Sequence, residues 1–254
     1  MCIFSAKVKS VSGTNIFARL NKGHQFLVYE MNLSTANEMA MILPLPVDHA
    51  QDANVSLIDL SPYPEFFSDL EKCFTLLCRS FAAVSMAATS APLAVLQVGS
   101  FEASIVPSVA DFSRLDQRFR LPSEIWQELP NYRDYAFAVF KLRAGESHIH
   151  PMALKFTSRF TDKIFFPTLH IHAGKVDVQA EFDHQLFAQG FNAPPEKWYE
   201  AVRPVAEVMD FERALHSISL ADIVDGEQAL FRSFIRGRQI NQDTFAAIHS
   251  DQAA

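Results

Sequence analysis

The hydrophobic and polar positions of residues 1–50 predict β-strands. "TNIFARL" and "HQFLVYEM" are β-rich runs, and the "NKG" between them is typical of a hairpin turn. "AMILPLPV" follows as a short apolar run closed by prolines, which suits a buried or edge strand that ends there. We therefore expect the chain to begin with strands.

Helical spacing appears in two segments. The first, "SPYPEFFSDLEKCFTLLCRSF", starts with Ser61 and Pro62, and its apolar residues fall on one helical face: Phe66, Phe67, Leu70, Phe74, Leu77 and Phe81. This pattern predicts an amphipathic helix over residues 62–81. The second segment runs from Pro194 to about His216 and predicts a C-terminal helix over residues 194–216.

Residues 93–190 read as the main β-region. "LAVLQVGSFEASIVPS", "YAFAVFKLRAG", "MALKFTSRF" and "KIFFPTLHIHAGKVDVQAEFDHQLF" predict strands, with two short helices around Pro122. "ALFRSFIRGRQI" alternates like a strand, and "NQDTFAAIHS" is expected to be a frayed tail. No internal repeat or linker interrupts the chain. We expect one α+β domain over residues 1–254, with largely antiparallel sheets and helices packed against them.

Composition narrows the functional classes. The 254 residues include 23 Phe, against five Tyr and two Trp, which predicts a well-filled core. The net charge of −7 argues against a nucleic-acid partner, because phosphate binding needs a concentrated basic face. The nearest basic group is Arg232, Arg236 and Arg238, and it has acidic neighbours.

The compartment follows from what the sequence does not contain. No charged start leads into an apolar signal region, and no apolar run approaches the ~20 residues that span a bilayer. Three cysteines, an odd number, do not make a disulfide framework, and Cys73 and Cys78 are wrongly spaced for a CxxC metal site. We expect a cytoplasmic protein that does not bind membranes.

Histidines gather in one predicted hairpin. "LHIHAGKVD" turns at residues 173–175, and residues two apart on a strand share a face. His170 and His172 are therefore expected to share a face with Asp177 and Glu181 on the returning strand. Imidazoles at this spacing can hold zinc or another divalent metal, with Asp177 or Glu181 as a ligand or as the group that orients a ligand.

Two further histidines could complete such a site. His148 and His150 form another alternate pair in "ESHIHP", although Gly145 and Pro151 favour a turn there. The alternative interpretation of the hairpin is a solvated polar face, on which the histidines pair with cross-strand carboxylates.

Cys2 is the candidate nucleophile. Methionine is normally removed before a small second residue, and the mature chain would then begin with a thiol and a free α-amine. An α-amine titrates near ~8, so one residue could supply both the attacking group and the base.

This start resembles the cysteine branch of the N-terminal nucleophile hydrolases, the penicillin acylase and bile-salt hydrolase type. In that family a second strand carries an aromatic–small–Arg sequence, which Phe17, Ala18 and Arg19 match here. Asn21 stands where the family has an acidic residue. The resemblance covers about the first thirty residues. It implies hydrolysis of amide bonds in a small-molecule or peptide-like substrate, with Arg19 favouring the thiolate and the developing oxyanion.

The middle of the chain resembles a family of uncharacterised bacterial proteins. The order "AMILPLPV", "VGSFEASIVPSVADFSRLDQRFRLP", "YAFAVFKLRAG" and "HPMALKFTSRFTDKIFFPTLHI" carries this resemblance, which implies architecture and no activity. Three functional hypotheses follow: a Cys2 hydrolase, a metal-binding protein or metalloenzyme at the hairpin, and a non-catalytic binding protein.

Overall fold

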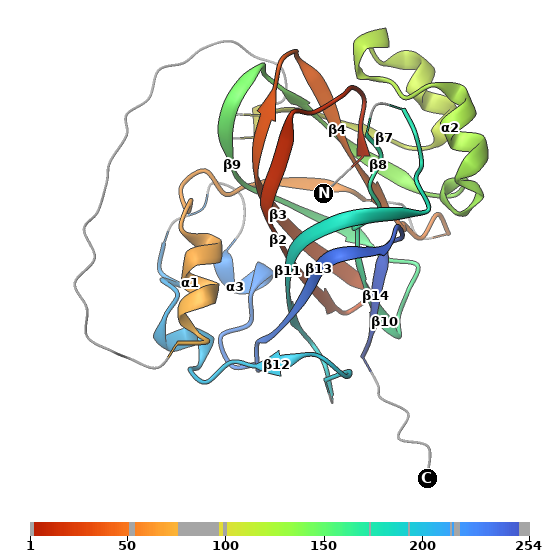
Figure 1. Ribbon diagram of the computed structural model, residues 1–254. Helices are drawn as coiled ribbons and strands as arrows, with labels where there is room; N and C mark the ends of the chain where they lie inside the picture. Colours follow the sequence, from red (N-terminus) through yellow and green to blue (C-terminus); the bar gives the residue numbers. More distant parts are fainter. Residues whose placement is uncertain are drawn as a thin grey trace.

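A computed structural model describes residues 3–50, 54–75, 97–98, 101–172, 174–192, 194–213, 215 and 219–248. Within these residues strand outweighs helix, so the fold is richer in sheet than the α+β expectation (Figure 1). The described strands form a seven-stranded sheet, a five-stranded sheet and a two-stranded ribbon.

The seven-stranded sheet contains the five longest strands of the described chain. Its strands in spatial order are β12 (Tyr199–Glu200), β13 (Phe231–Ile240), β11 (Gln179–Gln189), β2 (Ser10–Asn21), β3 (His24–Thr35), β9 (Gly145–Thr157) and β5 (Ser56–Asp59). Neighbours are antiparallel except β11 and β2, which run parallel from His184↔Thr14 to Gln189↔Arg19.

The five-stranded sheet packs against it. Its order is β1 (Ile3–Phe4), β4 (Met39–Leu45), β8 (Ala136–Leu142), β7 (Phe101–Val106) and β6 (Gln97–Val98). The ribbon joins β10 (Lys163–Phe166) to β14 (Thr244–Ala247). Every residue of β4 is buried, which confirms the apolar strand expected at "AMILPLPV".

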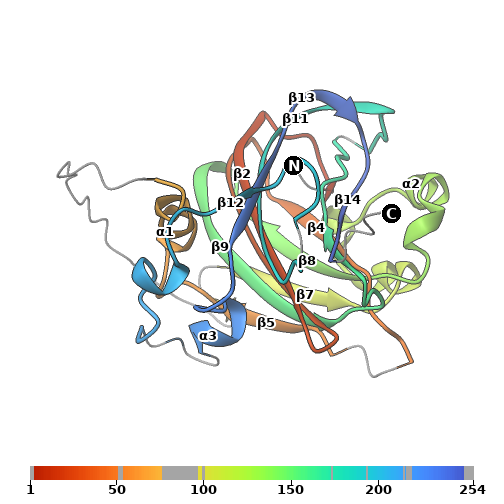
Figure 2. The same cartoon turned by 90° about the horizontal axis from the view of Figure 1, so that it is seen from below.

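The main core lies between the two sheets. Alternate residues of β2 and β3 meet alternate residues of β4 and β8, among them Ile16, Leu27, Met41 and Phe140. The opposite face of the seven-stranded sheet carries Phe17 and Phe187 and is covered by α1 (Phe66–Lys72) and α3 (Leu220–Ile223). Helix α2 (Ser123–Glu128) lies on the other side of the molecule (Figure 2).

The predicted "NKG" turn is present. Strands β2 and β3 pair from Asn21↔His24 onwards, and Lys22 and Gly23 have φ of 49° and 79°. Two consecutive positive φ values give the turn a twist that matches the strands it joins. Only one of the two residues is glycine, so Lys22 adopts a conformation that is uncommon for an L-residue.

Several predicted elements were wrong in kind or extent. Residues 194–216 form no long helix in their described part; they contain β12 and η4 (Val205–Glu207), because Pro194, Pro195 and Pro204 interrupt the pattern. The predicted frayed tail contains β14, whose partner β10 is distant in sequence.

The remaining corrections concern element boundaries. Helix α1 begins at Phe66 and not at residue 62, and the predicted continuation beyond residue 75 lies outside the described residues. His148 and His150 belong to β9 and not to a turn.

Gln25 ties the ribbon to the seven-stranded sheet. Its side chain is fully buried; Nε2 donates to the carbonyl oxygen of Phe165 at 2.7 Å, and Oε1 accepts from the Phe165 N–H at 3.1 Å. A buried strand that has a neighbouring strand on one side only must satisfy the backbone groups of its other side in another way. Gln25 does this for β10.

We expect Gln25→Ala to lower the free energy of unfolding by roughly 2–4 kcal/mol, because it leaves a buried N–H and a buried C=O unpaired. Urea denaturation of the variant would measure the loss. Gln179→Ala is the control, since Gln179 is exposed. Similar losses in the two variants would contradict this role of Gln25.

Candidate functional site

The N-terminal strand and the histidine hairpin meet. Ile3 pairs with Ile42 of β4 on one side and forms a parallel bridge with Ile171 on the other. The Phe4 N–H donates to the Ile171 carbonyl at 3.1 Å, and the Phe4 ring lies 5.8 Å from the His172 ring. The segment that follows Cys2 is therefore seated between His170 and His172 along the hairpin.

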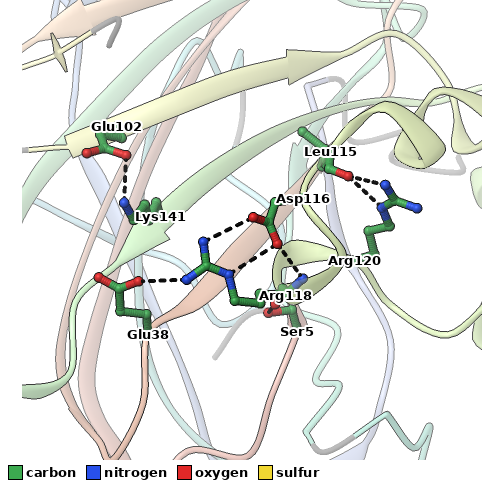
Figure 3. A network of polar contacts seen from close by, with 8 residues as sticks. All are labelled: Ser5, Glu38, Glu102, Leu115, Asp116, Arg118, Arg120 and Lys141. Atoms are coloured by element: carbon green, nitrogen blue, oxygen red, sulfur yellow. Dashed lines mark hydrogen bonds and ion pairs between the residues drawn. The ribbon is translucent and has the colours of Figure 1, made fainter. Parts of the chain in front are cut away.

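A polar network holds this strand in place (Figure 3). Ser5 Oγ donates to the Arg118 carbonyl at 3.0 Å and accepts from the Ala40 N–H at 2.9 Å. The Arg118 guanidinium in turn pairs with Asp116 at 3.0 Å and Glu38 at 3.4 Å. Hydrogen bonds to β4 and to the segment between β7 and α2 thus hold the chain where it leaves β1.

Three imidazoles stack inside the hairpin. The His170 ring lies 5.9 Å from the His172 ring and 5.2 Å from the His184 ring, and both pairs are close to parallel. The Phe182 ring is 4.2 Å from His170. His170 and His184 are buried, at 5% and 2% exposure. The histidines are part of the interior of the fold.

Asn241 holds the two arms of the hairpin. The turn is as expected, with Gly174 at φ +66° and a bridge between His172 and Lys175. Beyond that bridge the arms separate, and the Asn241 amide lies between them. Oδ1 accepts from the His170 N–H at 2.7 Å, while Nδ2 donates to the carbonyls of His170 and Asp177, each at 2.8 Å.

The predicted shared face of histidines and acids was wrong for His170, because the Asn241 amide separates the two arms. His170 turns inward, whereas Asp177 is exposed and pairs with Lys175 at 2.5 Å. A hairpin whose arms are separated by an amide does not keep the cross-strand geometry of a regular ladder. The alternative, a solvated face of His–carboxylate pairs, is excluded for His170 by the same burial.

The predicted metal ligands are not assembled in the described part of the chain. No group of three or more His, Cys, Asp or Glu side chains there is arranged to hold a metal ion. His150 lies in β9, three strands from β11, and its Nδ1 contacts the Pro151 carbonyl. His148 lies opposite Asn32 in the β3–β9 ladder, and the structure describes its backbone alone. Zinc binding stays a prediction that this geometry does not favour.

The candidate catalytic pair is only partly described. Cys2 lies outside the described residues. Arg19 is 4% exposed and lies on the face of the seven-stranded sheet that packs on α3, opposite to the face beneath β1. Its Nη2 pairs with Asp225 at 2.9 Å, and Nη1 donates to the Asp222 carbonyl at 3.2 Å. The structure therefore places Arg19 away from the N-terminal strand.

A cleft of about 840 Å³ opens on the other side of the hairpin. Sequence reasoning missed it, because its walls come from segments far apart in the chain. It is lined by Leu169 and Val176 of the hairpin, by residues 128–132 next to α2, and by residues 241–245 leading into β14. Its aromatic rings are Tyr132, Tyr135, Phe160 and Phe245.

Asp243 organises the cleft floor. One carboxylate oxygen accepts from the Tyr132 hydroxyl at 2.5 Å, and the other accepts from the N–H groups of Thr168 and Leu169, each at 3.0 Å. Burial raises the pKa of Asp243 to about 6, although these hydrogen bonds oppose the rise. Burial also raises the pKa of Tyr132, so its hydroxyl remains a donor.

Comparison with known proteins finds distant structural matches. No protein-family model matches the chain. The crystal structure of baculovirus P35 aligns at a TM-score of 0.48 and 11% identity, covering 97% of this chain and 99% of that one. The caspase-8/P35 complex aligns at 0.45 and 12%, covering 93% and 96%. At this level the likeness concerns the course of the chain and carries no functional argument.

A membrane-spanning helix needs sufficient length and hydrophobicity. None of the helices in the described segments is long and apolar enough to cross a bilayer.

We expect His170 to make stability depend on pH. Burial lowers the pKa of His170 to about 2, whereas an unfolded histidine titrates near 6.5. Below pH ~6.5 only the unfolded state takes up the proton, so stability falls by roughly 2 kcal/mol between pH 6.5 and 5. Urea denaturation across this range should show a smaller fall for His170→Gln. The exposed His49→Gln is the control, and equal pH dependence in both variants would contradict the assignment.

Proposed function

We propose that this protein acts by binding a segment of a partner protein in the cleft beside the hairpin. The observation that carries the proposal is the cleft itself, which combines four aromatic rings with the anchored pair Tyr132–Asp243. Its volume of about 840 Å³ falls in the range of ligand sites. Its exposed lining is more polar than apolar, so we expect a bound peptide to form hydrogen bonds as well as contacts with the rings.

The wall at β14 is suited to an anchoring side chain. Phe245 is 43% exposed, and its ring meets the Phe160 ring edge-on at 5.3 Å. Lys163 Nζ lies 4.4 Å and 4.9 Å from the centroids of the Phe160 and Phe245 rings. Aromatic residues are enriched in the cores of protein interfaces and contribute much of their binding energy.

The wall at residue 159 supplies a fixed cation. The Arg159 guanidinium lies 5.0 Å from the Tyr135 ring and donates to the carbonyls of Val47 and Asp134. These bonds hold its position, which lowers the entropy lost when a ligand binds. We therefore expect the preferred peptide to carry an aromatic or long apolar residue, followed by a polar acceptor.

Peptides selected from a random library on the wild-type protein would test this proposal. We expect Phe245→Ala to weaken their binding at least about tenfold. A tenfold loss of affinity corresponds to ~1.4 kcal/mol, which is less than the truncation of an aromatic anchor commonly costs. Asn131→Trp should weaken it as well, because Asn131 is an exposed residue of the cleft wall and the larger ring would fill the cleft. Calorimetry on each folded variant gives the affinities.

Tyr199→Ala is the matched control, because Tyr199 is an aromatic residue at 59% exposure on β12, outside the cleft. Its affinity for the selected peptides should be unchanged. Peptides that bind both cleft variants as tightly as the wild type would overturn the proposal.

A defined protein probe is also at hand. The comparison with P35 names a complex with caspase-8, so the residual activity of that protease can be titrated with this protein. Stoichiometric inhibition that Phe245→Ala relieves would identify the partner as a protease. The choice of probe comes from the named complex, and the support for the proposal is the cleft.

A second candidate function is acyl transfer by Cys2. The observation that favours it is the parallel bridge of Ile3, the residue after Cys2 in the sequence, with Ile171, which lies between the two histidines of the hairpin. His172 Nε2 is buried and has no hydrogen-bond partner among the described residues, so it can accept a proton. The thiolate would attack an amide carbonyl, the amine would leave with the proton, and water would hydrolyse the thioester.

The mass of the purified native protein tests this candidate first. We expect removal of Met1, followed by cleavage of the selected peptides that Cys2→Ser abolishes. His172→Gln should slow cleavage, whereas His49→Gln should not, because His49 is exposed and distant in sequence from the hairpin. Retention of Met1, or cleavage that survives Cys2→Ser, would exclude Cys2 as the nucleophile while leaving binding in the cleft intact.

A further inference from the structure

Strand β13 has an open outer edge. Its inner neighbour β11 pairs with it along its whole length, from Ala188↔Phe231 to Gln179↔Ile240. Its outer neighbour β12 pairs only with Phe231 and Arg232. Along residues 233–240 no other strand of the described chain lies on the outer side, and β13 runs along the outside of the molecule (Figure 2).

The backbone of this edge presents hydrogen-bonding groups outward. Asn241 donates inward to the Val178 carbonyl, and the Leu230 carbonyl accepts outward from Ala201. Because inward and outward hydrogen bonding alternates along an antiparallel strand, the backbone N–H and C=O groups of the even-numbered residues of β13 point away from β11. Gln239 Nε2 donates to the Arg236 carbonyl. The outward backbone groups that remain open are the N–H and C=O of Phe234 and Arg238 and the N–H of Arg236.

The side chains of the same residues form a row of cations around one ring. The Arg232 and Arg236 guanidinium groups lie 5.0 Å and 4.3 Å from the Phe234 ring centroid. Arg236 and Arg238 are exposed and lie directly opposite Asp183 and Glu181 of β11, and no ion pair joins them to these acids in the described part of the chain. Arg232, by contrast, pairs with Glu71 at 2.9 Å.

We infer that this edge binds an extended acidic segment of a partner protein, which adds a strand beside β13. Main-chain bonds to an exposed edge supply affinity, and alternate side chains supply specificity. Residues of an added strand would lie ~5 Å from Arg236 and Arg238, close enough for carboxylates to pair with both cations. A second copy of this chain is disfavoured there, because its own arginines would face them. This surface is separate from the cleft.

Binding of a synthetic peptide that alternates valine and glutamate tests the inference. We expect it to bind the wild-type protein at low salt at least about tenfold more tightly than the matching valine–lysine peptide, since like charges directly opposite one another repel. Arg236→Glu combined with Arg238→Glu should reverse this preference. Arg133→Glu with Arg143→Glu is the control, because both arginines are exposed and the net charge changes equally.

Strand addition also requires the peptide backbone. An acidic peptide methylated at two adjacent central nitrogens keeps its charge but cannot pair along either edge, so its affinity should fall at least about tenfold. Equal binding of the methylated and unmethylated peptides would overturn the inference. So would equal binding of the acidic and basic peptides, no binding of the acidic peptide, or an equal effect of the two double variants. Phe245→Ala should leave this binding unchanged, which distinguishes the edge from the cleft.

Discussion

Side-chain amides that replace backbone partners are the interaction on which this structure depends. Asn241 bonds to both arms of the histidine hairpin, and Gln25 bonds to both backbone groups of Phe165. Gln189 does the same for Asp225, accepting from its N–H at 2.9 Å and donating to its carbonyl at 2.7 Å. An amide offers a donor and an acceptor side by side, so it can satisfy a loop that has no strand beside it.

The hairpin depends on Asn241 most directly, and through it so do both candidate sites. The amide separates the arms, which lets His170 turn inward onto Phe182 and His184. On the other side of the same arms, Leu169 and Val176 become a wall of the cleft. Burial of the histidines and exposure of the cleft are thus two consequences of one distortion of a regular hairpin.

The polar groups of the molecule divide into those that hold the fold and those that face outward. Arg19 is buried, Asp243 is half-buried, and both are bonded, so their chemistry is used within the fold. Phe245, Arg236 and Arg238 face solvent on surfaces that can accept a partner. This division agrees with the proposal that the protein binds a partner, whereas acyl transfer would depend on Cys2, which lies outside the described residues.

Local pattern alone determined many of the strands. The β2–β3 hairpin, the buried strand β4 and the alternating strand β13 follow from hydrophobic periodicity and turn residues, which act over a few positions. The helix over residues 194–216 and the frayed tail were misread, because prolines and a distant partner, β10, decide those segments.

The candidate sites divide in the same way. The sequence singled out His170, His172 and Cys2 by residue type, and the structure seats the residue after Cys2 between those histidines. Which way the imidazoles face and where the cleft opens depend on Asn241 and Asp243, more than sixty residues from the side chains and loops they hold. The position of Arg19 depends on its bonds to Asp222 and Asp225, which are also distant in sequence. Such contacts leave no periodic trace along the chain, so tertiary packing alone decided them.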